Sequence, residues 1–177
     1  MQKNKNQGDS ISEYEYLLHI FIPILAAILV NAFIYLYGWN SERPLYKGLP
    51  PGYVIAVVWI IILGMLGYAH YLTYYSYASW IIVIALIYCL LYPFLTGLSK
   101  GDSIHRLVFQ ILFTKASSRN RPEPDSYFYN VIALLIAIVV CVTAYLENQK
   151  TIWFTLPFLL WTLYVSIITN KYVNNLL

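Results

Sequence analysis

Long apolar stretches without a single charged side chain dominate the pattern along this chain. The longest extends from residue 48 to residue 99, and others cover 16–41, 126–146 and 151–170. A hydrocarbon core of about 30 Å takes roughly 20 helical residues to cross, so the longest stretch suits two crossings and each other stretch one. The pattern predicts five membrane spans, near residues 16–38, 52–72, 78–98, 127–146 and 151–170.

The apolar stretches do not alternate with polar residues, and this decides the type of span. Residues 132–140, for example, are apolar without interruption, whereas the strands of a transmembrane barrel alternate. A helix satisfies its own backbone hydrogen bonds where no water is present, so it is the remaining spanning form. We therefore expect an all-α fold: one integral membrane domain over residues 1–177, built as a bundle of five transmembrane helices.

Composition and charge agree with this interpretation and orient the chain. The sequence is 60% hydrophobic and 11% charged, against roughly 25% charged residues in soluble domains. Eight of the eleven Lys and Arg residues lie in the first connection, the third connection and the C-terminal tail. The positive-inside rule places these segments in the cytoplasm and the N-terminus outside it. The partner expected from this charge pattern is membrane lipid, and no nucleic acid.

Two connections between the predicted spans have distinctive compositions. The third, over residues 99–126, contains an apolar island at 107–114 that is too short to span. We favour a short cytoplasmic helix lying on the membrane interface, with an extension of a neighbouring span as the alternative. The first connection is rich in proline and aromatic residues, which favours either a rigid lid over the helix ends or an aromatic belt at the membrane surface.

Several aromatic, proline and glycine positions follow one another in a fixed order. They are Trp39, the pair Pro50-Pro51, Val58-Trp59, Gly67-Tyr68 with Tyr71-Leu72, and the segment 156–161, which contains Pro157 and Trp161. Their joint spacing resembles the translocator protein family, also called the TspO/MBR family, tryptophan-rich sensory protein or peripheral benzodiazepine receptor. Five spans is also the number in that family. The chain departs from the family pattern at Leu63, where a Tyr is usual, and at Tyr88, where an Asn is usual.

The resemblance implies a membrane protein that binds, and on one interpretation translocates, a flat apolar ligand. A porphyrin, another haem-like tetrapyrrole or a sterol is the implied ligand, with no required cofactor and no metal. The resemblance, together with small residues such as Ala85 and Gly97, also implies a homodimer. An enzyme that degrades bound porphyrin with light and oxygen is the alternative, with Trp161 as the redox-active residue. A structural subunit without a ligand is a third interpretation.

Helix periodicity and the resemblance together suggest where such a ligand binds. The second and fifth predicted spans each place aromatic and apolar residues on one face, which suits a flat ligand that gains from stacking and burial. We expect a pocket that opens toward the cytoplasmic side and is covered by residues 39–51. Its expected lining is Trp39, Pro50, Pro51, Trp59, Leu63, Tyr88, Trp161 and Val165.

Catalytic signatures are absent from the sequence, which leaves the enzyme interpretation without a recognisable motif. There is no HExxH, no glycine-rich phosphate loop and no pair of carboxylates. Two ionisable residues nevertheless fall inside spans, His19 and His70, and both lie toward the same predicted interface. Hydrogen-bonded interface residues are the favoured interpretation of this pair, and axial ligands of a haem are the alternative.

A few further residues inside the predicted spans suggest how the helices pack. Gly64 and Gly67 share one side of the second span and are expected to allow close helix approach. Asn31 lies in the middle of the first span, and we expect it to hydrogen-bond to another helix. Cys89 and Cys141 both fall inside spans, so we interpret them as small apolar packing residues.

Overall fold

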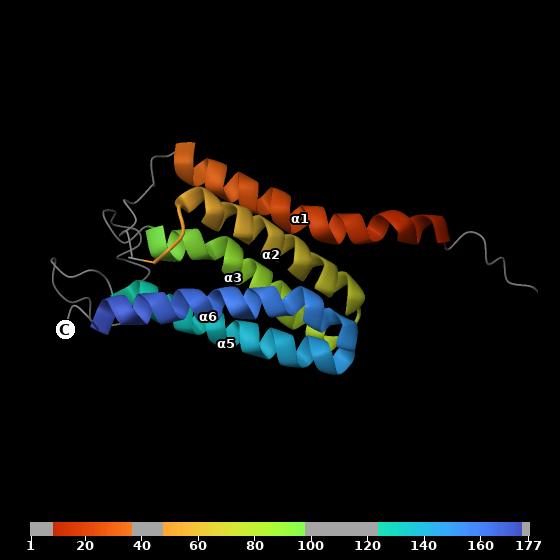
Figure 1. Cartoon of the computed structure of the whole chain (residues 1–177). Helices are drawn as coiled ribbons and strands as arrows, with labels where there is room; N and C mark the ends of the chain where they lie inside the picture. The colour runs from red at the N-terminus through yellow and green to blue at the C-terminus, as the bar shows by residue number, and fades with distance from the viewer. Residues whose placement is uncertain (1–8, 37–47, 98–123, 175–177) are drawn as a thin grey trace, which may run out of the picture.

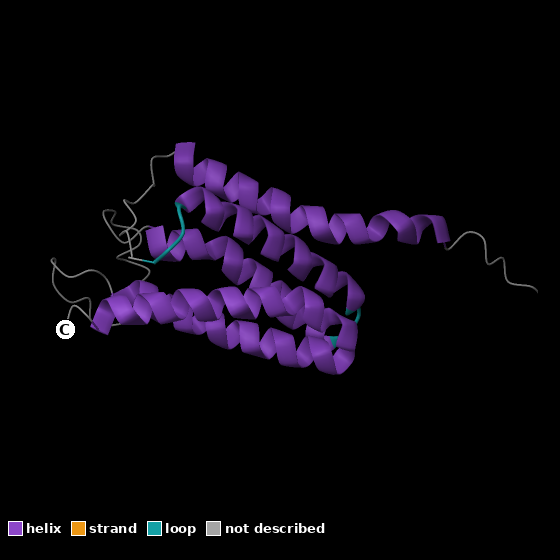
Figure 2. Cartoon of the chain, viewed as in Figure 1, coloured by secondary structure: helices purple, strands orange, loops and turns teal. Residues whose placement is uncertain are grey.

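The computed structural model describes residues 9–36, 48–97 and 124–174, and all the regular structure in these segments is helical (Figures 1 and 2). The elements are α1 (Asp9–Leu36), α2 (Gly52–Leu72), α3 (Tyr77–Gly97), α5 (Pro124–Glu147), the 3-10 turn η2 (Gln149–Thr151) and α6 (Ile152–Asn174). Trp39 and the island at 107–114 lie outside the described residues.

The predicted all-α membrane fold is confirmed. Four of the helices are long and apolar enough to cross a membrane, and α3 contains a shorter apolar stretch, Tyr77–Pro93. Within the described residues, each predicted span overlaps one helix, and the start of the second span at residue 52 is also the start of α2. The protein is therefore an integral, multi-pass membrane protein.

The five helices run up and down and leave their connections at two ends (Figure 1). The α2–α3 turn and the α5–η2–α6 connection lie at one end, where α1 also begins; we call this the turn end. The start of α2 and the end of α6 lie at the opposite end. α2 packs against α1, α3 and α6, while α5 packs against α3 and α6. α1 packs mainly against α2, so it occupies the edge of the bundle.

Proline chemistry sets the start of α2. Pro51 is the N-cap, with an extended ψ of 150°. Its carbonyl oxygen accepts the backbone N–H of Val54 at 2.9 Å and that of Ile55 at 3.2 Å. A proline costs nothing here because the first turn of a helix has no partner for its N–H groups. The pair Pro50-Pro51 therefore fixes how the chain enters the bundle.

Small side chains let the central helices pack closely. Ala85 of α3 and Ala137 and Ala144 of α5 are fully buried, and Phe158 of α6 fills the space between helices. In a membrane the helices gain little from apolar burial alone, so close packing of this kind supplies the attraction. The large apolar residues that remain exposed, such as Leu25 and Leu135, face the lipid.

The contact between α1 and α2 is closest at Gly67. A Cβ atom on Gly67 would lie 2.0 Å from the carbonyl oxygen of His19, whereas one on Gly64 would lie 3.2 Å from Cδ1 of Ile24. The prediction that these two glycines allow close helix approach is confirmed. Gly67 is the more demanding position because the atom it meets belongs to the backbone.

The prediction for Asn31 is wrong. Its side-chain amide donates to the carbonyl oxygen of Ala27 at 2.8 Å, one turn earlier on the same helix. Asn31 is exposed, because its part of α1 lies on the outer edge of the bundle. The amide satisfies itself within its own helix, and within the described residues it forms no hydrogen bond to another helix.

Asn130 of α5 forms the interhelical hydrogen bonds that the sequence assigned to Asn31. It is 4% exposed and accepts a hydrogen bond from the hydroxyl of Tyr92 of α3. Its amide donates to Thr169 of α6 at 3.3 Å, and its backbone carbonyl accepts the hydroxyl of Ser166 at 3.1 Å. This one residue therefore joins three helices near the end of the bundle where α6 terminates.

Replacing Asn130 with leucine is expected to lower the free energy of unfolding by about 1–2 kcal/mol, because two side-chain bonds are lost inside the membrane. Thermal unfolding of the purified protein measures this loss. Asn31→Leu is the matched control and is expected to change the stability little. Equal destabilisation by the two substitutions would contradict the role of Asn130.

Candidate functional site

An open groove of about 530 Å³ lies between α2 and α6. Its walls are almost entirely apolar, and it is open along one side. We call it the α2–α6 groove. The residues that line it are Pro50, Val58, Ile61, Ile62, Pro157, Leu160, Trp161 and Tyr164. Ile61 and Leu160 are 54% and 56% exposed, so in a membrane the rim of the groove meets lipid.

The segment just before α2 is tied to α6 and completes one wall of the groove. The hydroxyl of Tyr164 donates to the carbonyl oxygen of Gly48 at 2.6 Å. Gly48 has a φ of +107°, a backbone conformation that favours glycine. This bond holds the residues around Pro50 across the groove, so the entry to α2 and the last half of α6 form one surface.

Trp161 is the largest aromatic side chain in the groove. It is half-buried, and its ring lies 5.6 Å from that of Tyr164 between centroids. Its indole Nε1 is buried and has no hydrogen-bond partner within residues 9–36, 48–97 and 124–174. A buried donor without an acceptor is costly, so this N–H is an unfavourable feature of the packing around Trp161.

Two predicted residues of α2 lie beside the groove instead of in its lining. Trp59 packs on the core, with ring centroids 5.9 Å from Tyr92 and 6.4 Å from Phe158. Leu63 is 3% exposed and belongs to the core. Their neighbours Val58 and Ile62 line the groove. One residue turns a helix by about 100°, and the α2 face toward the groove is displaced by that one step.

The remaining predicted residues occupy different surroundings. Tyr88 of α3 donates its hydroxyl to the backbone carbonyl of Tyr129 at 2.7 Å, which joins α3 to α5. Val165 is half-buried on α6, and Pro51 is exposed at the start of α2; none of these three is in the groove lining. Of the predicted set within the described residues, Pro50 and Trp161 line the groove together.

The groove residues that the sequence did not suggest follow helical spacing. On α6, Pro157, Leu160 and Tyr164 share a face with Trp161, at intervals of three and four residues. Ile61 and Ile62 follow Val58 on α2 in the same way. On α6, helical spacing from Trp161 could have predicted these lining residues. On α2 no large aromatic residue marks the face, so no such signal was present.

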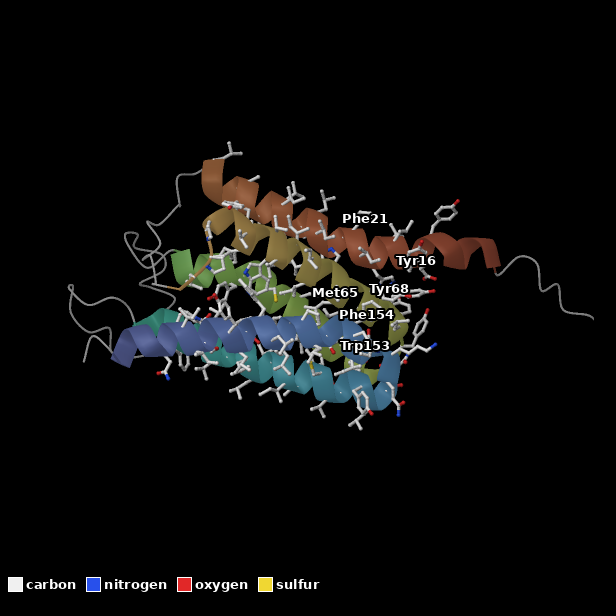
Figure 3. The ribbon with its side chains drawn as sticks, in the orientation of Figure 1. Tyr16, Phe21, Met65, Tyr68, Trp153 and Phe154 are labelled. Carbon is white, nitrogen blue, oxygen red and sulfur yellow. The ribbon has the colours of Figure 1, made fainter. Side chains whose placement is uncertain are left out.

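Trp153 provides a contrast on the same helix. It lies near the turn end of α6, as Figure 3 shows, and is 72% exposed.

Within the described segments, no group of three or more His, Cys, Asp or Glu residues is placed to hold a metal ion. The groove therefore offers apolar and aromatic contact, and the one hydroxyl in its lining, that of Tyr164, is already bonded to Gly48.

Comparison with known proteins identifies the family to which the chain belongs. A model of the TspO/MBR family matches residues 19–174, which is nearly the whole chain. No curated protein and no solved structure matches.

Proposed function

This chain belongs to the TspO/MBR family, and from that premise we propose that it binds a flat apolar molecule of the porphyrin or sterol class in the α2–α6 groove. Membership of the family supports a ligand-binding or transport role in a membrane. The observation that carries the finer proposal is the groove itself, with Trp161 in its wall.

The size and lining of the groove suit such a ligand. Its volume of about 530 Å³ falls within the roughly 300–1,000 Å³ of small-molecule sites. A flat ring system gains from burial against Pro157 and from stacking on Trp161. A sugar or an inorganic ion would find too few polar partners here.

A porphyrin-degrading enzyme is the second candidate, and the position of Trp161 favours it. An indole that contacts a bound porphyrin is placed to take part in light-driven oxidation by molecular oxygen. This candidate predicts a bilin-like product that disappears in Trp161→Phe. Simple binding predicts that the porphyrin is recovered unchanged from both proteins.

Titration of the detergent-purified protein with protoporphyrin IX tests the proposal. We expect saturable quenching of tryptophan fluorescence at one ligand per chain, in the dark and without loss of porphyrin absorbance. Illumination in air then separates the two candidates by their products. Binding that does not saturate, for protoporphyrin IX and for cholesterol alike, would contradict the proposal.

The orientation in the membrane follows as a proposal from the charge asymmetry. We expect the N-terminus outside the cytoplasm and the C-terminus within it. Cysteines introduced at Ser10 and Asn175 are therefore expected to react with an impermeant reagent from opposite sides of the membrane. Reaction of both from one side would overturn this orientation.

A homodimer is proposed from the family resemblance and from the small residues of α3. Such helices associate in lipid through close packing. Native mass spectrometry from a mild detergent is expected to give the mass of two chains, and a monomer mass alone would argue against it.

A further inference from the structure

Two histidines meet near the turn end of the bundle, away from the α2–α6 groove. Nδ1 of His19 on α1 lies 2.7 Å from Nδ1 of His70 on α2, and the ring centroids are 4.8 Å apart. The sequence favoured hydrogen-bonded residues at these two positions, which is confirmed, and the structure adds that each is the other's partner. A bond between two ring nitrogens needs one N–H donor and one bare nitrogen acceptor, so at least one of the two imidazoles must be neutral.

The pair sits where α1 and α2 approach most closely. Gly67, whose missing side chain makes room for the backbone of His19, lies one turn before His70 on the same side of α2. α1 has its main packing partner in α2. A change in the bond between His19 and His70 therefore acts directly on the contact that holds α1 to the bundle.

The groups around the pair are aromatic. The ring of Tyr74 lies 5.1 Å from His19 and 5.6 Å from His70, and that of Tyr71 lies 5.6 Å from His19. Tyr16 of α1 packs against Tyr71 with the two rings tilted by 58°. None of these side chains carries a charge near neutral pH.

Farther from the two histidines lie one end of α6 and a few charged residues. Figure 3 shows Tyr16, Tyr68 and Phe154 close together near this end, and Phe154 brings α6 against Tyr68 at 4.7 Å between centroids. Glu15 lies one turn before His19 on α1, and Glu147 and Lys150 are exposed at the turn end. Within the described residues, no carboxylate hydrogen-bonds to either imidazole. A positive charge on the pair is therefore not neutralised by a carboxylate in contact with it.

We propose that His19 and His70 form one shared proton-binding site that holds α1 against α2 until the second proton binds. The neutral pair and the singly protonated pair both keep one donor and one acceptor, and the bond is charge-assisted in the second case. With two protons, both Nδ1 atoms carry hydrogen and two positive charges face each other. The bond is then lost, and α1 separates from α2 at the turn end.

The separation between α1 and α6 tests this proposal in the full-length protein in lipid nanodiscs. Spin labels are placed on cysteines at Phe21 and Trp153, which are both exposed, while the native Cys89 and Cys141 are buried. Histidine ordinarily titrates near pH 6.5, so distances are compared at pH 8 and pH 4.5. We expect the separation to lengthen and broaden at pH 4.5.

A matched variant separates the proton-binding role from simple packing. In His70→Asn the amide oxygen accepts the N–H of His19 in either protonation state of His19, so we expect the same separation at both pH values. His105→Asn, outside the described residues, is expected to keep the wild-type response. A wild-type separation that does not change with pH, or an equal change in His70→Asn, overturns the proposal.

Nitrogen NMR of ring-labelled histidines follows proton binding directly in the wild-type protein. It therefore tests the proposal even if the variant does not fold. Two coupled proton-uptake steps assigned to His19 and His70 are expected. Two independent titrations near pH 6.5 would overturn the shared site.

Discussion

Replacing Gly67 with alanine is expected to detach α1 from α2 and to lower the free energy of unfolding by about 1–3 kcal/mol. The new Cβ atom would lie 2.0 Å from the carbonyl oxygen of His19. That oxygen belongs to the helix backbone and cannot rotate away, so the two helices must move apart. The hydrogen bond between His19 and His70 would be stretched by the same movement. Thermal unfolding of the purified protein measures the loss.

Gly64→Ala is the matched control for Gly67→Ala. Its Cβ would meet side-chain atoms alone, the nearest being the end of Ile24 at 3.2 Å, which can yield by a small rotation. Alanine is also the better helix former by about 1 kcal/mol. The control is therefore expected to be close to the wild type in stability. A Gly67→Ala protein as stable as the control would show that α1 does not dock as described.

Replacing Trp161 with alanine is expected to weaken the binding of protoporphyrin IX by about tenfold to a hundredfold. The substitution removes a stacking surface from the groove, a loss on the order of 1–3 kcal/mol. Trp161→Phe keeps a smaller aromatic face, so its loss should be smaller, about 1 kcal/mol. Titrations of the three proteins side by side give the affinities.

Trp153→Ala is the control for the Trp161 series. Trp153 is on the same helix, but it is 72% exposed near the turn end and does not line the groove. Its removal should leave the affinity unchanged. If Trp153→Ala weakened binding as much as Trp161→Ala, the indoles would act as a membrane-interface belt and the groove would not be the binding site.

The fold could be predicted from the sequence because two simple quantities determine it. Apolar length fixes how many times the chain crosses, and the lack of backbone partners in lipid requires each crossing to be a helix. The double proline before residue 52 marks the start of α2 as sharply in the sequence as in the structure. The close approach at Gly67 also followed from residue size alone.

The lining of the groove depends on helix rotation, which periodicity leaves open. Val58 lies nine residues before Gly67, which is about two and a half turns of helix. The two residues are therefore on opposite sides of α2. Docking of Gly67 against α1 therefore turns Val58 and Ile62 toward α6, where they line the groove as well as pack on the core. Trp59 and Leu63 pack on the core without lining the groove. The sequence identifies the faces of α2 but does not say which neighbour each one meets.

Hydrogen bonds between helices were harder still to foresee. Tyr88 was expected to face a ligand, and its hydroxyl is bonded to the backbone of α5. Asn31 and Asn130 are both amides inside predicted spans, yet only Asn130 reaches other helices. Asn130 lies in a helix that packs against both α3 and α6, whereas Asn31 is exposed on a helix at the edge of the bundle. That difference is a property of the assembled fold.

Mapping the site with a photoreactive porphyrin tests the central claim most directly. After illumination of the complex and proteolysis, adducts are expected in residues 58–62 of α2 and 157–164 of α6, and an excess of protoporphyrin IX is expected to suppress them. Adducts confined to α3 and α5, or labelling of all helices that protoporphyrin IX does not suppress, would contradict binding in the α2–α6 groove.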